Sequence, residues 1–476
     1  MVKQQDKGKA ASRQAGSRRD LKEQRIPRIT ADTPVGVCED RLTAFGGLTA
    51  LVKMLDLVDF EREFEKTYAA PGRKPQLGHY RMVVGMVMLL FIGFQRLGHF
   101  AYLRQDSMLC GFLKVPLLPV VTTFWRYLKS LGVNQSASLL RLSGVLRKKA
   151  WALMDYRPRK VRINIDTTTA TVYGEIEGSR KGYNPKHRGK KGLRPVLCFL
   201  EGTREFLCGT QRRGETLSGK EVAYQIGQFR KLLPCCVKEI LACGDGEHIG
   251  WESVKACKNK GISFIFGNKS CKPPFPKKGW YWQGEYEYNE CLYQPQGWGE
   301  ACRFVVMRIE EKKAEEKQLN LPDLEGYSYR VFATDLEKPP HRVIEAYDPR
   351  AGVENLIGES QREGLLAIPS RSFQANHAFF QIVMLVYNLW RWMKLLAGHH
   401  EKEQQKGKVP DKDIKITMPD HTIRIARLKM LYVAAKIQYH GRQDVVKYSL
   451  HDDRTPSLLE FLKYLDRRRR EKRKAA

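Results

Sequence analysis

The chain has no long uninterrupted apolar segment, which argues against a membrane-spanning protein. Its longest apolar run, Met82 to Phe94, is shorter than the roughly 20 residues that cross a bilayer. The longer stretch from Ala378 to Leu396 is interrupted by polar side chains, namely Gln381, Asn388, Arg391 and Lys394. We therefore interpret that stretch as a buried core helix. The N-terminus is basic and polar, with no apolar core or cleavage site, so it predicts no signal peptide.

The sequence also lacks the cysteine spacing of a structural zinc site. Its eleven cysteines include no C-x-x-C pair, and nothing indicates an oxidising compartment. We expect reduced thiols in or near a core, and a cytosolic protein.

Acidic residues are scarce relative to basic ones. Lys and Arg number 83 against 52 Asp and Glu, a net charge of +31. Such an excess predicts a polyanionic partner, most simply a DNA backbone, with binding that weakens as salt rises. A membrane surface is the rival polyanion, and no anchoring segment favours it.

Composition and periodicity divide the chain into five parts. We predict a flexible basic arm over 1–36, a helical DNA-binding region over 37–154, a catalytic core over 155–268 and 341–396, a β-rich insertion over 269–340, and a C-terminal region with a basic tail over 397–476. The helical region carries many basic side chains, for which solvated faces are the alternative to DNA contacts: Arg96, Arg104, Arg126, Lys129, Arg141, Arg147, Lys148 and Lys149.

The core begins where the hydrophobic period changes to two, at Val161. We predict strands over 161–166, 170–177, 195–200, 205–211, 239–243 and 262–267, and helices over 218–232 and 251–260. Between the second and third strands lies a basic loop, Gly178 to Arg194, that contains Arg180, Lys181, Lys186, Arg188, Lys190 and Lys191. This order is typical of an α/β fold with a ribonuclease-H-like mixed sheet, here with a β-rich insertion before its last helix. The aromatic side chains of that insertion are suited either to stacking on unpaired bases or to packing between strands.

Three carboxylates stand at predicted element boundaries. Asp166 and Asp245 each follow an apolar strand-like run, and we expect parallel pairing of those strands to bring them to one sheet edge. Asp348 before Pro349 predicts an N-cap and a first helical position, which puts Glu354 one turn into a helix. Arg350 and Glu354 then share a face that Gln361 continues. Taken alone, that pattern indicates no more than a surface ion pair.

Together these stretches resemble the DDE transposases of bacterial insertion sequences, in particular the thirteen-eighty family with its DDE domain group 1 layout. The segment Tyr347-x2-Arg350-x3-Glu354-x6-Gln361 matches the Tyr-x2-Arg-x3-Glu-x6-Lys signature at three of four positions. Further likeness lies in Ile165-Asp166-Thr167-Thr168, Gly182-Tyr183-Asn184-Pro185, Arg212-Arg213-Gly214-Glu215 and Phe373-Gln374-Ala375-Asn376. The likeness covers roughly residues 40 to 450.

The resemblance implies a reaction and its partners. It implies two divalent ions, Mg²⁺ or Mn²⁺, held by Asp166, Asp245 and Glu354, with cleavage at the element's ends and strand transfer of the 3′-hydroxyl. Tyr347, Arg350 and Gln361 would contact DNA near the scissile phosphate, and the basic loop would bind the backbone. The implied partners are terminal inverted repeats and target DNA, bound by a homodimer in the bacterial cytoplasm at the nucleoid.

Two departures from the family pattern keep other functions open. Gln361 stands where the signature has Lys, and Asp245 is followed by Gly246-Glu247-His248, where related sequences more often have Ser-Gly-Phe. We expect His248 to be a surface residue, with a positioning or DNA-contact role as the alternative. A catalytically inactive DNA-binding repressor and a metal-dependent nuclease without strand transfer remain the alternative functions.

Overall fold

The computed structural model describes residues 29–182, 184, 187–269, 271–310, 326–405 and 418–475. The chain divides into two compact units, Met1–Asp40 and Arg41–Ala476. Only residues 29–40 of the first unit are described, and they contain neither helix nor strand. Most of the predicted basic arm therefore lies outside the described residues.

The second unit begins with a strand and a set of helices. These are β1 (Arg41–Thr43), α2 (Leu48–Leu57), α3 (Phe60–Thr67), α4 (His79–Phe91), η1 (Leu97–Leu103), α5 (Ser107–Leu113), α6 (Val121–Lys129) and α7 (Val133–Leu153). Helices make up most of this range, as predicted for residues 37–154. That region does not begin as a helix, because β1 pairs antiparallel with β14 (Ala435–His440) near the other end of the chain.

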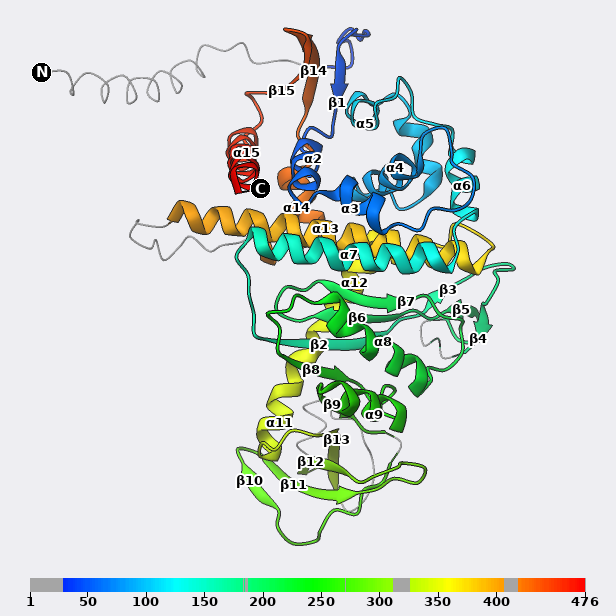
Figure 1. Cartoon of the computed structure of the whole chain (residues 1–476), viewed down its shortest axis with the longest axis vertical. Helices are drawn as coiled ribbons and strands as arrows, with labels where there is room; N and C mark the ends of the chain where they lie inside the picture. The colour runs from blue at the N-terminus through cyan, green and yellow to red at the C-terminus, as the bar shows by residue number, and fades with distance from the viewer. Residues whose placement is uncertain are drawn as a thin grey trace, which may run out of the picture. The chain divides into compact units, whose positions relative to one another are not determined.

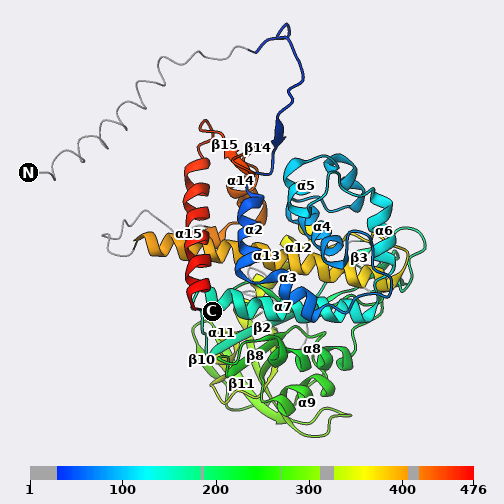
Figure 2. The ribbon, with the colours of Figure 1, turned by 45° about the horizontal axis from the view of Figure 1, so that its top comes forward.

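Two long helices lie side by side beneath that helical set (Figures 1 and 2). They are α7 and α13 (Phe373–Gln405). The interpretation of residues 378–396 as a core helix is confirmed, since all four of its polar interruptions are buried. Two of them form hydrogen bonds with strand β7 (Phe206–Thr210) of the main sheet. Asn388 Oδ1 accepts from Phe206 N, and Asn388 Nδ2 donates to the Phe206 carbonyl oxygen. The Gln381 amide donates to the Gly209 carbonyl oxygen.

The main sheet has nine strands in the order β10-β11-β12-β13-β9-β8-β2-β6-β7. The strands predicted for the catalytic core make one end of this sheet: β2 (Lys160–Thr167), β6 (Val196–Leu200), β7 (Phe206–Thr210), β8 (Glu239–Gly244) and β9 (Ser263–Gly267). β2 pairs parallel with β8 and antiparallel with β6, and β8 pairs parallel with β9. The predicted mixed sheet and the predicted parallel neighbours are therefore confirmed. The crossover helices α8 (Gly219–Leu232) and α9 (Trp251–Lys260) also lie as predicted. A capping box starts α8, in which Ser218 and Glu221 bond each other's backbone N–H.

The strand predicted over 170–177 is mostly absent. Only β3 (Ala170–Thr171) forms, and Gly174, inside the predicted range, has a φ of 79° that is incompatible with a continuous strand. The predicted loop after it instead holds β4 (Arg180–Lys181) and β5 (Lys191–Leu193), and the three strands make a small sheet in the order β3-β5-β4.

Strands β10 (Tyr281–Gln283), β11 (Tyr286–Tyr293), β12 (Cys302–Glu310) and β13 (Tyr327–Thr334) continue the main sheet, because β13 pairs antiparallel with β9. Helix α11 (Pro340–Tyr347) covers one face through a small core that includes Tyr288, Val305, Phe332 and Val343. Of the aromatic side chains considered for base stacking, Tyr288 packs into this core, whereas Trp282 is 60% exposed.

The chain ends with elements that return to the N-terminal helices. They are η5 (Met418–Asp420), α14 (Ile423–Met430), β14, β15 (Gln443–Tyr448) and α15 (Thr455–Ala475). The basic tail forms the end of α15, and part of it is engaged in intramolecular pairs: Arg469 contacts Asp56 and Lys472 contacts Asp59, each at 2.6 Å. Within the described ranges, no helix is both long and apolar enough to cross a membrane.

Burial of His377 on α13 predicts a loss of stability in acid. Burial lowers the pKa of His377 to about 4, and its Nε2 has no hydrogen-bond partner among the described residues. Its ring lies between those of Phe373 and Phe380. The unfolded chain, with an ordinary histidine pKa near 6.5, binds the proton first, so folding stability falls as pH drops from about 6.5 toward 4.

We expect His377→Phe to remove about 2 kcal/mol of the stability difference between pH 7.5 and pH 5. Urea unfolding at the two pH values measures it. His400→Phe, at the partly buried far end of the same helix, is the comparison. An unchanged pH dependence in His377→Phe would show that this histidine is protonated in the folded protein.

Candidate active site

Asp166 and Asp245 lie at the same edge of the main sheet. Asp166 is the penultimate residue of β2, and Asp245 directly follows β8. In the parallel ladder Ile165 is opposite Gly244, so the next residue of each strand carries one of the two aspartates. The sheet register therefore places both carboxylates side by side, as predicted from the strand order.

Each of these aspartates contacts a buried cationic or imidazole side chain. Arg350 Nη2 is 3.1 Å from Asp166 Oδ2 and 3.4 Å from the Ile165 carbonyl oxygen. His248 Nδ1 is 2.5 Å from Asp245 Oδ1. Each carboxylate also accepts a hydrogen bond from a backbone amide: Thr167 N donates to Asp166 Oδ1, and Glu247 N donates to Asp245 Oδ1.

The expectation that His248 is a surface residue is wrong, because its exposed fraction is 1%. The turn after β8 folds its ring back onto the end of the strand, and a Cβ on Gly244 would lie only 2.8 Å from the Cβ of His248. Glycine at position 244 is thus what allows this histidine to reach Asp245. The alternative role, positioning, is the one that this geometry favours.

The two carboxyl groups differ in their electrostatics. Burial raises the pKa of Asp166, and the charges of Arg350 and His248 offset this only in part. Burial also opposes ionisation of Asp245, but the hydrogen bond and charge of His248, with the charge of Arg350, outweigh it and lower its pKa. Neighbouring positive charge thus stabilises two adjacent, partly buried carboxylates.

Glu354 is presented by a helical segment that differs from the prediction. The chain is helical from α11 through η3 (Asp348–Ala351) into α12 (Gly352–Ser360), so Asp348 does not cap a helix; its carboxylate pairs with Arg330 at 2.8 Å. Glu354 does lie in the first turn of α12, as expected. Its side chain is exposed, and no hydrogen bond or ion pair joins it to another described residue.

Contacts on both sides of Glu354 orient its helix toward the aspartates. Arg350, four residues earlier, touches Asp166, and Gln361, seven residues later, donates from Nε2 to Thr168 Oγ1 at 2.8 Å. Residues spaced by four and seven share one helical face. Glu354 therefore lies on the face of α12 that meets the end of β2. Among the described residues, however, no three His, Cys, Asp or Glu side chains are close enough to hold one metal ion.

Tyr347 packs behind Arg350. Its ring centroid is 4.6 Å from that of Phe332, and the Arg350 guanidinium carbon is 5.9 Å from the Tyr347 ring. Burial raises the pKa of the Tyr347 hydroxyl to about 12, with the Asp245 charge adding to the effect and Arg350 opposing it. Tyr347 therefore stays protonated at neutral pH.

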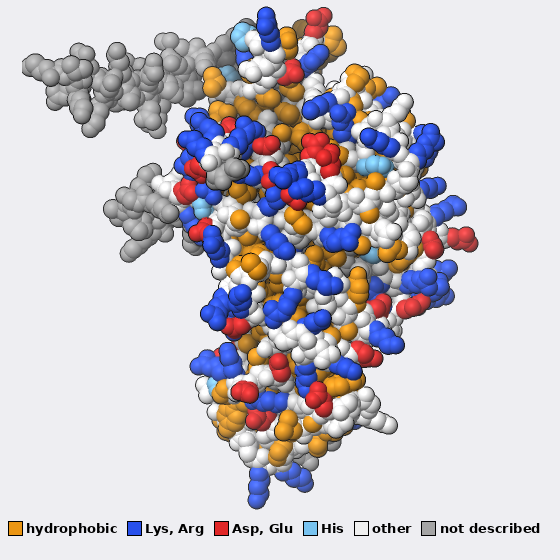
Figure 3. Space-filling view, in the orientation of Figure 1, with side chains coloured by type: hydrophobic (Ala, Val, Ile, Leu, Met, Phe, Trp, Pro, Cys, Tyr) orange, Lys and Arg blue, Asp and Glu red, His pale blue; other side chains and the backbone are white. Residues whose placement is uncertain are grey.

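The basic side chains predicted for DNA binding lie on the small β3-β5-β4 sheet, which begins four residues after Asp166. Arg180, Lys181, Arg188, Lys190 and Lys191 are all exposed, while Lys186 lies outside the described residues. Arg180 is 3.6 Å from Glu215. For the other four, the described residues supply no acidic partner within ion-pair distance. Figure 3 shows that Lys and Arg side chains are also spread over other parts of the surface.

Two residues near the site were not identified from sequence. Arg194 was counted with the basic loop, yet it is buried and forms a two-point ion pair with Glu247 at 2.5 and 2.6 Å. Glu247 had no assigned role. A buried arginine is not distinguishable by sequence from the exposed ones around it; the one available signal was an acidic residue two positions after Asp245. Arg147, one of the basic residues considered for DNA contact, is likewise fully buried.

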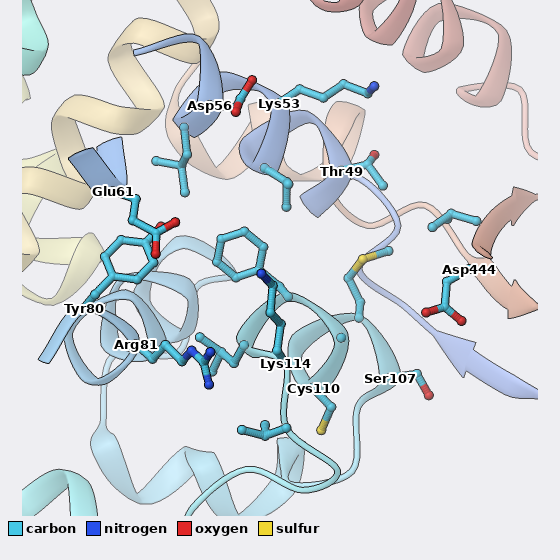
Figure 4. A pocket seen from close by; sticks show the side chains of 18 of the residues that line it. Thr49, Lys53, Asp56, Glu61, Tyr80, Arg81, Ser107, Cys110, Lys114 and Asp444 are labelled. Atoms are coloured by element: carbon cyan, nitrogen blue, oxygen red, sulfur yellow. The ribbon is translucent and has the colours of Figure 1, made fainter. Parts of the chain in front are cut away.

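A pocket of about 1310 Å³ contains none of these site residues. It lies among α2, α3, α4, α5, β14 and β15, and Figure 4 shows opposite charges around it, such as Lys53, Asp56, Arg81 and Asp444. Two of these charges are paired: Lys53 with Asp466 and Asp56 with Arg469. This mixed charge does not match a nucleic-acid backbone.

The contrast between Glu354 and Glu359 on the same helix makes a stability prediction. Glu359 is buried and accepts from Ile423 N at 2.7 Å. Glu359→Ala leaves that buried donor unsatisfied and should cost about 1–3 kcal/mol. Glu354→Ala removes an exposed side chain that pairs with no described residue, so it should change the free energy of unfolding by less than about 0.5 kcal/mol. Urea denaturation of the two variants checks this, and comparable losses would mean that Glu354 has a structural partner.

Comparison with known proteins identifies the family of this chain. No curated protein sequence matches it. Among solved structures, it is similar to the piggyBac transposase in a synaptic complex with hairpin DNA, at 10% identity and a TM-score of 0.41 over 81% of this chain and 79% of that one. It is also similar to the Mos1 transposase in a paired-end complex with the left transposon end, at 10% identity and a TM-score of 0.17 over 41% of this chain and 60% of that one. Residues 39–470 match the family described as transposase DDE domain group 1, and the chain belongs to that family.

Proposed function

We propose that this transposase cleaves DNA at the ends of its insertion sequence and transfers the freed 3′-hydroxyl to target DNA, with Asp166, Asp245 and Glu354 as catalytic residues. The observation that carries the proposal is the parallel pairing of β2 with β8, which sets two partly buried carboxylates side by side at one sheet edge. Membership of the DDE family supports the same interpretation.

The chemistry of the two aspartates suits a divalent cation. Carboxylate oxygens are the ligands that Mg²⁺ and Mn²⁺ prefer, and Asp166 and Asp245 supply two carboxylates next to each other. Glu354 would supply the third, because its carboxylate has no other described partner and its helix face meets β2. Two bound ions would stabilise charge on the attacking and leaving oxygens of an in-line displacement.

The chain's own residues would hold the DNA. Arg350 and Gln361 flank Glu354 on one helix face, so both are within reach of a phosphate that meets the three acids. Tyr347 buttresses Arg350 and, being protonated, can donate a hydrogen bond to a phosphate oxygen. The exposed cations of the β3-β5-β4 sheet would bind the adjoining backbone, and cutting two ends together would require a homodimer on DNA.

Asp166→Asn should abolish cleavage. The substrate is labelled duplex DNA that carries the sequences flanking the gene, incubated with Mg²⁺ or Mn²⁺. Loss of this carboxylate should lower the cleavage rate on the order of a thousandfold, as when a charge-stabilising group is removed. Gel analysis of nicked, cut and joined products measures it.

Asp335→Asn is the matched control. Asp335 also follows a strand, β13, and accepts from Phe264 N at 2.8 Å, but the antiparallel pairing of β13 with β9 puts it at the opposite sheet edge. We expect this variant to cut normally. Absence of cleavage by the unaltered protein would favour the repressor, and cleavage without joined products would favour the nuclease.

The small basic sheet should contribute to the salt dependence of DNA binding. Replacing Lys181, Arg188, Lys190 and Lys191 by Gln should reduce the slope of log K against log salt by about 0.9 for each phosphate that is no longer neutralised. The comparison set is Arg157, Arg159, Lys160 and Lys238, exposed cations at the other ends of β2 and β8. Fluorescence anisotropy over a salt series checks it, and an equal effect of both sets would mean that this sheet is not a preferred contact.

A further inference from the structure

The turn after β8 connects the two aspartates through hydrogen bonds. Thr167 donates its backbone N–H to Asp166 Oδ1 at 2.7 Å and its hydroxyl to Glu247 Oε2 at 3.1 Å. Glu247 in turn donates its backbone N–H to Asp245 Oδ1 at 3.0 Å. A continuous path therefore runs from one carboxylate to the other, with Thr167 and Glu247 as its two intermediates.

Arg194 fixes the Glu247 carboxylate in this path. Its two terminal nitrogens lie 2.5 and 2.6 Å from the two carboxylate oxygens, and the second also lies 3.3 Å from Thr167 Oγ1. A planar guanidinium that binds a carboxylate at two points restricts its orientation more than a single contact does. The Arg194 side chain is almost fully buried, so water competes little for this pair.

Arg194 is itself held by the strands behind it. Its backbone N–H donates to the Arg212 carbonyl oxygen at 3.1 Å, and the Arg212 side chain pairs with Glu221 at 2.6 Å. Arg194 follows β5, and Arg212 lies just after β7. Because Arg194 is attached to these strands, the position of Glu247 is fixed relative to the sheets.

We propose that Glu247 is a positioning residue that, through Thr167 and Arg194, sets the placement of Asp166 relative to Asp245 for the binding of divalent cations. This inference rests on the proposed function. Outer groups that hydrogen-bond to ligands commonly change metal affinity by about 10–100-fold when they are removed. Glu247 is linked to Asp245 by its backbone N–H and to Asp166 through Thr167, so it has such a role for both aspartates. Its carboxylate pairs with Arg194.

Two conservative variants test the role. Thr167→Val removes the hydroxyl and keeps both the shape and the backbone N–H that Asp166 accepts. Glu247→Gln keeps the backbone N–H to Asp245 and weakens the pair with Arg194. The control is Glu201→Gln, because Glu201 pairs at 2.7 Å with Arg162, which lies on β2 toward the end away from Asp166.

The readout is Mn²⁺ binding by full-length protein without DNA, measured by calorimetry and by the metal-dependent rise in thermal midpoint. We expect Thr167→Val and Glu247→Gln to weaken binding about tenfold or more, and Glu201→Gln to bind like the unaltered protein. In the cleavage assay the two site variants should need more Mn²⁺ for half-maximal rate and recover most of the rate at saturation.

Two other outcomes separate the claims. The unaltered protein could bind Mn²⁺ and cut DNA while Thr167→Val and Glu247→Gln bind Mn²⁺ as tightly as it does. In that case the positioning role is wrong and the proposed function stands. If the unaltered protein neither binds Mn²⁺ nor cuts, the proposed function fails. A loss of thermal stability in Thr167→Val and Glu247→Gln but not in Glu201→Gln, with unchanged Mn²⁺ affinity, would assign Glu247 to folding alone.

Discussion

The buried carboxylate of Glu205 is the interaction on which the arrangement of helices and sheet depends. It lies just before β7, is fully buried, and accepts from Arg147 Nε at 2.8 Å, Trp151 Nε1 at 2.7 Å and Trp392 Nε1 at 2.8 Å. A buried carboxylate is stable only when such donors are all in place, and removing one partner of a buried ion pair commonly costs about 3–5 kcal/mol. Because those donors belong to α7 and α13, the carboxylate fixes both helices against the sheet.

The acids at the sheet edge depend on the same kind of pairing. Positive charge beside Asp166 and a histidine beside Asp245 stabilise two partly buried carboxylates next to each other, and the parallel register of β2 and β8 decides where they lie. Glu354 lies on a helix, α12, that is fixed at its C-terminal side. There, just past α12, the buried Glu363 pairs with Arg427 at 3.0 Å. Glu354 thus remains exposed on a segment that is fixed at both ends by buried charge.

Sequence patterns predicted what depends on local periodicity and missed what depends on distant partners. The alternation in β2 and the apolar run of β8 indicated both strand ends, and therefore the neighbouring aspartates. Asp348-Pro349 has the local pattern of a helix start, but Arg330 on β13 takes the aspartate, and the helix has already begun at Pro340. His248 and Arg194 look like surface residues by composition. His248 is buried because a local turn closes it onto Gly244, four residues earlier, and neither composition nor periodicity indicates that turn. Arg194 is buried because it meets Glu247, which only the folded sheet brings close to it.

Net charge, finally, overstates the surface available to DNA. Several arginines are engaged inside the protein, among them Arg147, Arg350, Arg391 and Arg427, all buried against carboxylates or carbonyl oxygens. Even in the tail of α15, Arg469 and Lys472 pair with Asp56 and Asp59. Salt dependence counts the phosphates that are neutralised and not the formal charge of the chain. The exposed cations of β4, β5 and the turn between them belong to the small sheet whose first strand, β3, begins four residues after Asp166, and most have no acidic partner among the described residues. They are therefore a better guide to the proposed DNA contacts than the value of +31.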